Sequence, residues 1–477
     1  MLFDTPVYIV FLTIVVALYW RLERRAQNVF LLTASYFFYA WWDWRFLGLI
    51  LLSTVVDYYC AHIVDRSNEA AKRKAALILS VTLNLGFLGV FKYYNFFVDS
   101  FAAMLDTVGI SVSHSTLRIL LPPGISFYTF QALAYIVDVY YRRLKPAQSL
   151  LDYALFISLF PHLIAGPIQR PSHLLPQVQA PRHFDASKFF DGLMLILSGL
   201  FRKVVIADNC ALLADAAFNG KLGEPSLAVV AIGVYAFAWQ IYGDFSGYSD
   251  MARGSAQLMG FHFMVNFRQP YLAQSLQDFW RRWHISLSTW LRDYLYISLG
   301  GSRQGERKTY RNLMLTMLIG GLWHGANWTF VIWGGIHGVG LAIERFFRRM
   351  MPWLEVADGE ARPSIASPAV WLRRIFVFHL VCLSWIFFRA TSIGAAFDFL
   401  GGVGHVAWLP EYGTAFVFLV AFTVPMFLLD LVNEYRSEEY VTERTRPVWR
   451  VAVAMSLMVA ALLFAGGSTN AFIYFQF

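Results

Sequence analysis

Charged residues are scarce in this sequence. Of its 477 residues only 15% are Asp, Glu, Lys or Arg, and 57% are hydrophobic, whereas ordinary soluble domains carry about 25% charged residues. The few charges stand in short clusters between long apolar runs, so no stretch could present the polar surface of a soluble domain. The composition predicts one integral membrane domain over residues 1–477.

Cysteine is also rare, and familiar catalytic motifs are missing. The three cysteines, Cys60, Cys210 and Cys382, stand among apolar neighbours without metal-ligand spacing, so we expect neither a disulfide framework nor a metal site. The sequence contains no Gly-x-Ser-x-Gly elbow, no Walker loop, no His-Glu-x-x-His pair and no Gly-x-Gly-x-x-Gly fingerprint. These absences argue against the common soluble hydrolases, ATPases and metalloproteases.

Long apolar runs fill most of the chain. Several are shorter than the ~20 residues that a membrane span needs, and several are broken by Gly or Pro. We therefore expect an all-α polytopic membrane protein with ten to twelve spans, together with re-entrant or interfacial helices. The runs are 7–20, 29–42, 46–64, 75–90, 119–141, 153–168, 189–207, 227–242, 313–343, 375–388, 416–432 and 451–465.

Lys and Arg lie beside these runs and form no separate basic domain, so the net charge of +8 does not indicate a nucleic-acid partner. Cationic clusters follow the first, third and fifth runs, while residues 99–117 contain no Lys or Arg. Because cationic loops stay in the cytoplasm, the N-terminus is expected outside, and no sides are assigned after about residue 170.

Two further segments are interpreted from their composition. Run 7–20 follows no positive segment and ends in the bulky pair Tyr19-Trp20, so we expect it to remain as a span and not to be removed as a signal peptide. Residues 351–368 combine acidic residues with prolines and predict an extramembrane loop.

Two histidines lie in a stretch without charge. No Asp, Glu, Lys or Arg occurs between Arg311 and Glu344, and His324 stands beside glycines that would loosen a helix. A polar ring within a span is expensive unless it lines a cavity or finds a partner, so His324 is a candidate base for proton removal from a hydroxyl. The alternative is a hydrogen bond to a neighbouring helix, which we favour for His337.

Residues 278–294 show the period of an amphipathic helix, with His284 at the border between its faces. Its arginines could meet phosphate or lipid head groups, or could merely anchor the helix, and for Arg281 and Arg282 the two alternatives stay open. The apolar stripe is Phe279, Trp283, Leu287, Trp290 and Tyr294, and the opposite face holds Arg281, Ser288 and Arg292.

Three shorter groups carry weaker signals. Asp244 and Asp250 place two carboxylates in a membrane-rich region, where they could orient a histidine, pair with arginines or cap a helix. Segments 122–128 and 162–167 interrupt apolar runs, as broken helices that line cavities do.

Two motifs carry a family resemblance. The run Phe-Trp-Arg-Arg-Trp-His-Ile-Ser-Leu-Ser at 279–288, Arg-Asp-Tyr at 292–294 and Gly-Leu-Trp-His-Gly-Ala at 321–326 resemble the membrane-bound O-acyltransferase (MBOAT) family, in the branch of the alginate O-acetyltransferase membrane subunit. The likeness extends over nearly the whole chain, including 39–42, 124–130, 244–250 and 472–475. Related branches serve teichoic acid D-alanylation and the acetylation of peptidoglycan and cellulose.

The resemblance implies helices around a central funnel, with His324 as the catalytic residue and His284 as a second characteristic polar position. It also implies an acetyl-CoA donor, without a bound cofactor or metal. Residues expected to contact substrate are Trp323, Asn327, Arg281, Arg282, Ser288 and Asp244.

The resemblance further implies a setting in the bacterial inner membrane, surrounded by lipid. Acetyl would pass from the cytoplasmic thioester to a secreted polysaccharide, alginate first among the candidates, directly or through a periplasmic or membrane-anchored acetyltransferase. A thioester is already activated, so the protein must mainly position it, remove a proton and exclude water. His324 would act as general base or would carry the acetyl group transiently.

Other functions stay open at this point. D-alanyl or other acyl transfer to a cell-wall polymer is the nearest enzymatic alternative. A transporter could use the histidines as a proton relay, although no inverted repeat is visible. A scaffold for polysaccharide export would not need them.

Overall fold

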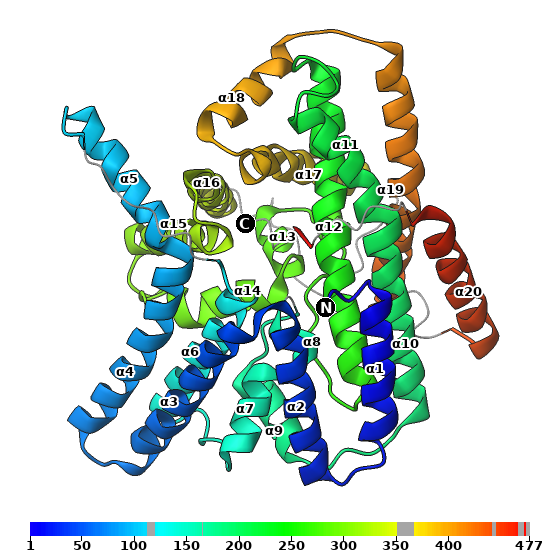
Figure 1. The fold of residues 1–477 in the computed structure, drawn as a ribbon. Coiled ribbons are helices and arrows are strands. Elements are labelled where there is room, and N and C mark those ends of the chain that lie inside the picture. The colour runs from blue at the N-terminus through cyan, green and yellow to red at the C-terminus, as the bar shows by residue number, and fades with distance from the viewer. Residues whose placement is uncertain (112–119, 165, 351–366, 441–444, 466–471, 474–477) are drawn as a thin grey trace. The chain divides into compact units, whose positions relative to one another are not determined.

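The computed structural model describes residues 1–111, 120–164, 166–350, 367–440, 445–465 and 472–473 (Figure 1). Every regular element in this part of the chain is a helix, which confirms the predicted all-α class. The helices form two compact units, residues 1–196 with 251–264 and residues 197–250 with 265–477. Of the predicted loop 351–368, residues 351–366 lie outside the described ranges.

The first unit opens with apolar helices joined by tight turns. Asp43 separates α2 from α3, because its extended backbone ends one helix while its carboxylate accepts the amide of Arg45 at 3.0 Å. The helices of this unit are α1 (Pro6–Tyr19), α2 (Arg24–Asp43), α3 (Leu47–Arg66), α4 (Ala70–Leu88), α5 (Tyr94–Thr107), α6 (Ile125–Tyr140), α7 (Leu150–Ser158), α8 (Phe160–Leu163), α9 (Pro171–Gln179) and the larger part of α10 (Ala186–Phe201).

A buried carboxylate ties three of these helices together. Asp57 of α3 accepts hydrogen bonds from Ser80 at 2.6 Å and Asn84 at 3.0 Å on α4, and from Tyr153 of α7 at 3.4 Å. A carboxylate inside an apolar bundle is tolerated when donors surround it. The polar residues in these apolar runs therefore position helices.

The two sequence interruptions of the first unit lie against each other. Gly124 adopts a left-handed conformation with φ of 74° before α6, and a Cβ there would collide with the carbonyl oxygen of Leu163 in α8. Only glycine allows this approach without strain. Helices α6, α7 and α8 are buried along nearly their whole length, in line with the expectation that some of the shorter runs are buried.

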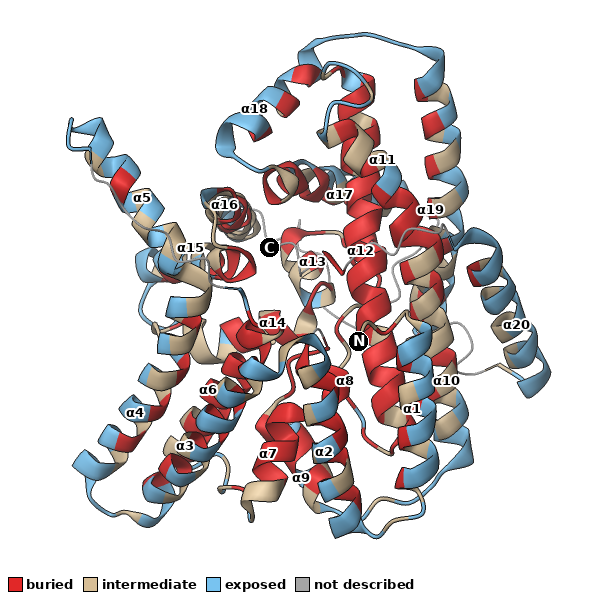
Figure 2. Cartoon of the chain, viewed as in Figure 1, coloured by how far each residue is buried: buried red, intermediate tan, exposed pale blue. Residues whose placement is uncertain are grey.

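The second unit contains the longest helix, α12 (Leu227–Leu258), which also extends into the first unit. Figure 2 shows α12 buried along most of its length and α20 largely exposed. The other helices are α11 (Asp208–Phe218), α13 (Leu276–Arg282), α14 (Ile285–Trp290), α15 (Glu306–His324), α16 (Trp328–Met350), α17 (Pro368–Arg389), α18 (Ile393–Gly401), α19 (Pro410–Arg436) and α20 (Pro447–Phe464).

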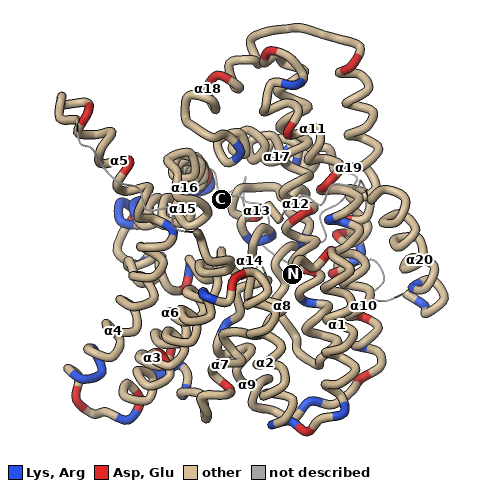
Figure 3. Tube along the Cα trace, viewed as in Figure 1, with Lys and Arg blue, Asp and Glu red and all other residues tan. Residues whose placement is uncertain are grey.

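Seven helical stretches of the described chain are long and apolar enough to cross a membrane. Two of them, Arg24–Arg66 with 43 residues and Ala70–Thr107 with 38, contain two helices each. Figure 3 shows charges gathered at the turn from α3 to α4. The chain is thus a multi-pass membrane protein, while the number of ten to twelve spans stays a prediction. Helix α1, with 14 residues, would rise only about 21 Å.

Candidate active site

His324 is the last residue of α15, and the chain turns back at once into α16. The turn is held by Asn327, whose side-chain oxygen accepts the amide of Thr329 at 3.0 Å and whose amide donates to the carbonyl of Thr391 at 3.1 Å. The interpretation of residues 313–343 as one span is therefore wrong, since two antiparallel helices share this apolar run. Because the polar groups of this turn are paired within the protein, the turn can form without charged residues, and the sequence contains no charge by which to locate it.

Two glycines bring α15 and α16 into close contact beside His324. A Cβ on Gly321 would collide with the carbonyl oxygen of Phe330, and one on Gly334 with that of Met317. Helix α15 runs unbroken through Gly321, so this glycine does not loosen the helix, as the sequence suggested, but lets the backbone of α16 approach. The close packing at these two glycines therefore determines where His324, at the end of α15, lies.

His284 lies between two short helices. The prediction of one amphipathic helix over residues 278–294 is wrong, because α13 ends at Arg282 and α14 begins at Ile285. His284 has φ of 43° and ψ of 53°, the left-handed region that non-glycine residues rarely adopt. Such strain persists only where the surroundings impose it, and it is frequent at functional sites. Here it directs a fully buried imidazole.

Asn266 fixes the orientation of the His284 ring. The Asn266 side-chain oxygen accepts the backbone amide of Ser286 at 3.3 Å and its hydroxyl at 2.9 Å, while the amide nitrogen donates to Ser249 at 3.1 Å. The same oxygen lies 3.1 Å from Nδ1 of His284. Since the backbone amide can only donate, the oxygen is an acceptor, and Nδ1 must carry a proton. In the neutral ring Nε2 is then the basic nitrogen.

The structure brings the two motif histidines together. Their ring centroids are 6.3 Å apart, and both residues are buried. Trp323 lies next to both, with ring centroids 5.8 Å from His284 and 5.1 Å from His324. Residues 40 positions apart in the sequence, counted as 324 − 284, thus form one site.

Aromatic rings surround the pair. Trp333 of α16 and Phe388 of α17 present their rings at 5.0 Å and 5.4 Å from His324. Phe245 of α12 lies perpendicular to His284 at 4.6 Å. Such walls exclude water and strengthen any electrostatic interaction within them. Among the residues the structure describes, no group of three His, Cys, Asp or Glu side chains could hold a metal ion.

His337 has the contacts of a core histidine. Its Nδ1 accepts a hydrogen bond from Trp280 at 3.3 Å, and its Nε2 lies 3.0 Å from the hydroxyl of Ser384. Both ring nitrogens therefore have partners within the helical core. These contacts agree with the structural interpretation preferred from the sequence.

The structure separates the two neighbouring arginines of the motif. Arg282 forms ion pairs with Asp278 and with Glu434 of α19, both at 2.7 Å, and Glu434 also pairs with Arg374 of α17 at 3.3 Å. Arg281 is exposed. Glu434 thus connects α19 to α13 and α17.

Two other expected substrate residues have partners within the protein. Ser288 donates to the carbonyl of Trp283 at 3.1 Å. Asp244 pairs with Lys203 at 3.0 Å and accepts the backbone amide of Ile473 at 2.7 Å. Asp244 therefore holds residues 472–473 next to α12.

Sequence reasoning missed the residues that support the histidines. Asn266 stands in an ordinary segment, and Trp333 and Phe388 look like core aromatics. Arg202 and Lys203 are two adjacent cations inside the apolar run 189–207, a rare feature that could have indicated buried ion pairs.

Comparisons with known proteins show which family the chain resembles. The family model of the membrane-bound O-acyltransferase (MBOAT) family matches residues 36–388, which include both histidines. The chain is 46% identical to the probable alginate O-acetylase AlgI of Azotobacter vinelandii over 400 residues, 83% of this chain and 76% of that protein. It is 40% identical to the protein of the same name from Pseudomonas putida, with full coverage of both chains.

A third relative carries a different name. The peptidoglycan O-acetyltransferase of Helicobacter pylori is 38% identical over 84% of this chain and 80% of its own length. The family match covers well over half of the sequence, and the relatives align over most of both chains. The chain therefore belongs to the membrane-bound O-acyltransferase family.

Proposed function

We propose that this chain is an O-acetyltransferase that acetylates a secreted polysaccharide, alginate, with His324 as the catalytic base. The observation that carries the proposal is the buried pair of imidazoles, 6.3 Å apart, in a member of an acyltransferase family. The relatives named alginate O-acetylase, at 46% and 40% identity, support alginate as the polymer. Because the chain belongs to an acyltransferase family, we propose acyl transfer and not a proton-relaying transporter or a scaffold for polysaccharide export.

The reaction needs only proton movement and positioning. An acceptor hydroxyl oxygen attacks the thioester carbonyl carbon while His324 removes the hydroxyl proton. The tetrahedral intermediate then collapses, the carbon–sulfur bond breaks, and the imidazolium returns its proton to the departing thiolate. The aromatic walls keep water away from the thioester, which would otherwise be hydrolysed.

His284 assists from its place beside both His324 and Trp323. Because Asn266 holds the proton on Nδ1, Nε2 is the nitrogen that would accept a hydrogen bond from the acceptor hydroxyl or from His324. We propose that Trp323 packs on the acetyl group and that Arg281 contacts phosphate of the donor. Arg282, Asn327, Ser288 and Asp244 would position these residues through the bonds described above.

The cellular arrangement follows from the same proposal. The donor is acetyl-CoA from the cytoplasm, the protein lies in the bacterial inner membrane with its N-terminus outside, and a periplasmic or membrane-anchored acetyltransferase completes delivery to the polymer. The cationic clusters after the first, third and fifth apolar runs support this orientation.

Labelled donors test the function directly. The purified full-length chain in lipid nanodiscs is supplied with acetyl-CoA carrying a labelled acetyl group, together with its partner and alginate. Label in alginate ester is the expected result, and acid quenching of a single turnover shows whether label also resides on the protein. Label transfer from a D-alanyl thioester in place of acetyl-CoA, or donor consumption without any ester, would overturn the proposal.

Replacement of Asn266 tests the role of His284. Asn266→Ala removes the acceptor for Nδ1, and we expect kcat to fall about 10- to 100-fold, the usual effect of losing such a supporting residue. Asn266→Asp keeps an acceptor but favours the imidazolium form, so the acid limb of the pH–rate profile should move to higher pH. A purely structural role predicts no movement of that limb, and kcat and pH profiles of both variants distinguish the two.

A further inference from the structure

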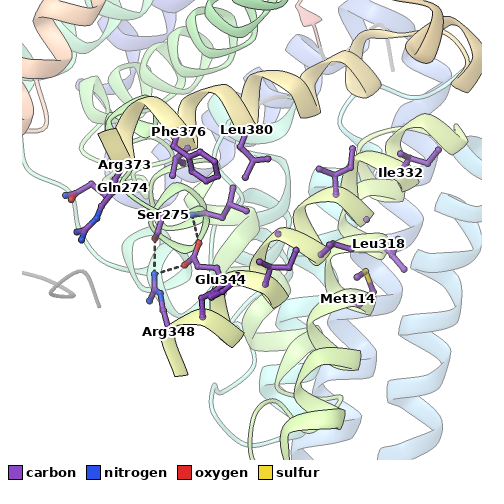
Figure 4. A pocket seen from close by; sticks show the side chains of 18 of the residues that line it. Gln274, Ser275, Met314, Leu318, Ile332, Glu344, Arg348, Arg373, Phe376 and Leu380 are labelled. Carbon is purple, nitrogen blue, oxygen red and sulfur yellow. Dashed lines mark hydrogen bonds and ion pairs between the residues drawn. The ribbon is translucent and has the colours of Figure 1, made fainter. Parts of the chain in front are cut away.

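A long groove lies between α15, α16 and α17 of the second unit, on a different face of α16 from the one that meets His324. Its volume is about 980 Å³, at the upper end of ligand-binding clefts. Figure 4 shows apolar side chains such as Leu318 and Ile332 at one end and the polar residues Ser275, Glu344 and Arg348 at the other. The groove is therefore amphipathic along its length.

The apolar part of the groove lies on two helices that are long enough to cross the membrane. Val339, Ile343 and Phe347 of α16 are 47%, 51% and 49% exposed, and Phe376 of α17 is 68% exposed. Apolar walls of this kind do not retain water. In a bilayer, hydrocarbon chains are the material that covers them.

The polar end carries one cation more than its carboxylate neutralises. Arg348 is paired with Glu344 at 2.6 Å and also donates to Gln277 at 2.8 Å and Ser275 at 3.0 Å. Arg373 also lines the groove, and within the part of the chain that the structure describes it makes no ion pair or hydrogen bond. A half-buried guanidinium at the rim of an apolar groove offers a fork that matches a phosphate.

We propose that this groove binds an anionic phospholipid, with an acyl chain along α16 and the headgroup phosphate on Arg373. Arg348 lies two residues before the end of α16, and Arg373 lies five residues after the start of α17. Helix ends with arginines mark the headgroup level of a membrane. An anionic phospholipid has one negative headgroup and long hydrocarbon chains. It therefore matches a groove that is apolar except for the cation Arg373 at its polar end.

Lipid retention by the full-length chain tests the proposal without any use of its activity. The protein is purified, equilibrated with phosphatidylglycerol or phosphatidylcholine of identical acyl chains, and analysed by native mass spectrometry. We expect the wild type to retain phosphatidylglycerol about fivefold better, the effect of one arginine near an anionic surface. Arg373→Gln should remove this preference, whereas Arg349→Gln, at the end of α16 but outside the groove, should keep it.

A second variant tests whether an acyl chain of the lipid occupies the apolar part of the groove. Gly335 lines the groove, and a Cβ there meets only Leu318, at 3.6 Å, so Gly335→Leu is chosen to fill part of the apolar space. We expect lower retention of both lipids. Equal retention of the two lipids by the wild type, an unchanged preference in Arg373→Gln, or a polypeptide that occupies the groove in place of lipid would overturn the proposal.

Discussion

Replacing His324 with alanine is expected to lower acetyl transfer to the polymer by about two to four orders of magnitude, the usual contribution of a general base. The imidazole lies at the end of α15, 6.3 Å from His284 and within a wall of aromatic rings. Among the described residues of this wall, Trp323, Trp333 and Phe388 carry no group that could accept the hydroxyl proton in its place. Single-turnover transfer from labelled acetyl-CoA measures the loss.

His337→Gln supplies the matched control. His337 belongs to the same uncharged stretch and is equally buried, but its ring bonds to Trp280 and Ser384. Glutamine can keep both hydrogen bonds, so we expect this variant to retain most of its activity. Wild-type transfer by His324→Ala, or an equal loss in both variants, would contradict a catalytic role for His324.

That His324 is a polar ring in apolar surroundings could be predicted from the sequence, because the composition of the stretch around it is visible there. Such a ring costs free energy unless it lines a cavity or has a partner. No charge occurs between Arg311 and Glu344. The turn after His324 could not be predicted, since the Asn327 side chain that holds it also donates to the carbonyl of Thr391, 64 positions away. A distant partner leaves no local signal.

The break at His284 was hidden for a related reason. Residues on both sides of it are helical, so the apolar period of 278–294 continues across the break. What ends α13 is a pair of backbone bonds to another segment, from Arg268 to the carbonyl of Arg282 and from Ile285 to that of Asn266, both at 2.9 Å. At His284, contacts with a distant segment therefore end the helix, although the apolar periodicity of the sequence favours its continuation.

Gly334→Ala is expected to reduce transfer at least about 100-fold, because a shift of 1 Å in a catalytic group can have this effect. The added methyl group would collide with the carbonyl oxygen of Met317, and backbone of α15 cannot move aside without moving His324. Gly335→Ala is the matched control, since its Cβ meets only Leu318 at 3.6 Å.

Transfer assays and thermal unfolding of both variants separate displacement from loss of the fold. A folded Gly334→Ala protein with low kcat indicates that α16 sets the position of the catalytic ring. Normal transfer by this variant would mean that α15 and α16 can separate without cost to the chemistry. In that case the glycine pair would not be what positions His324. The comparison therefore tests whether helix packing, and not only the presence of two histidines, makes this apolar interior an acyltransferase site.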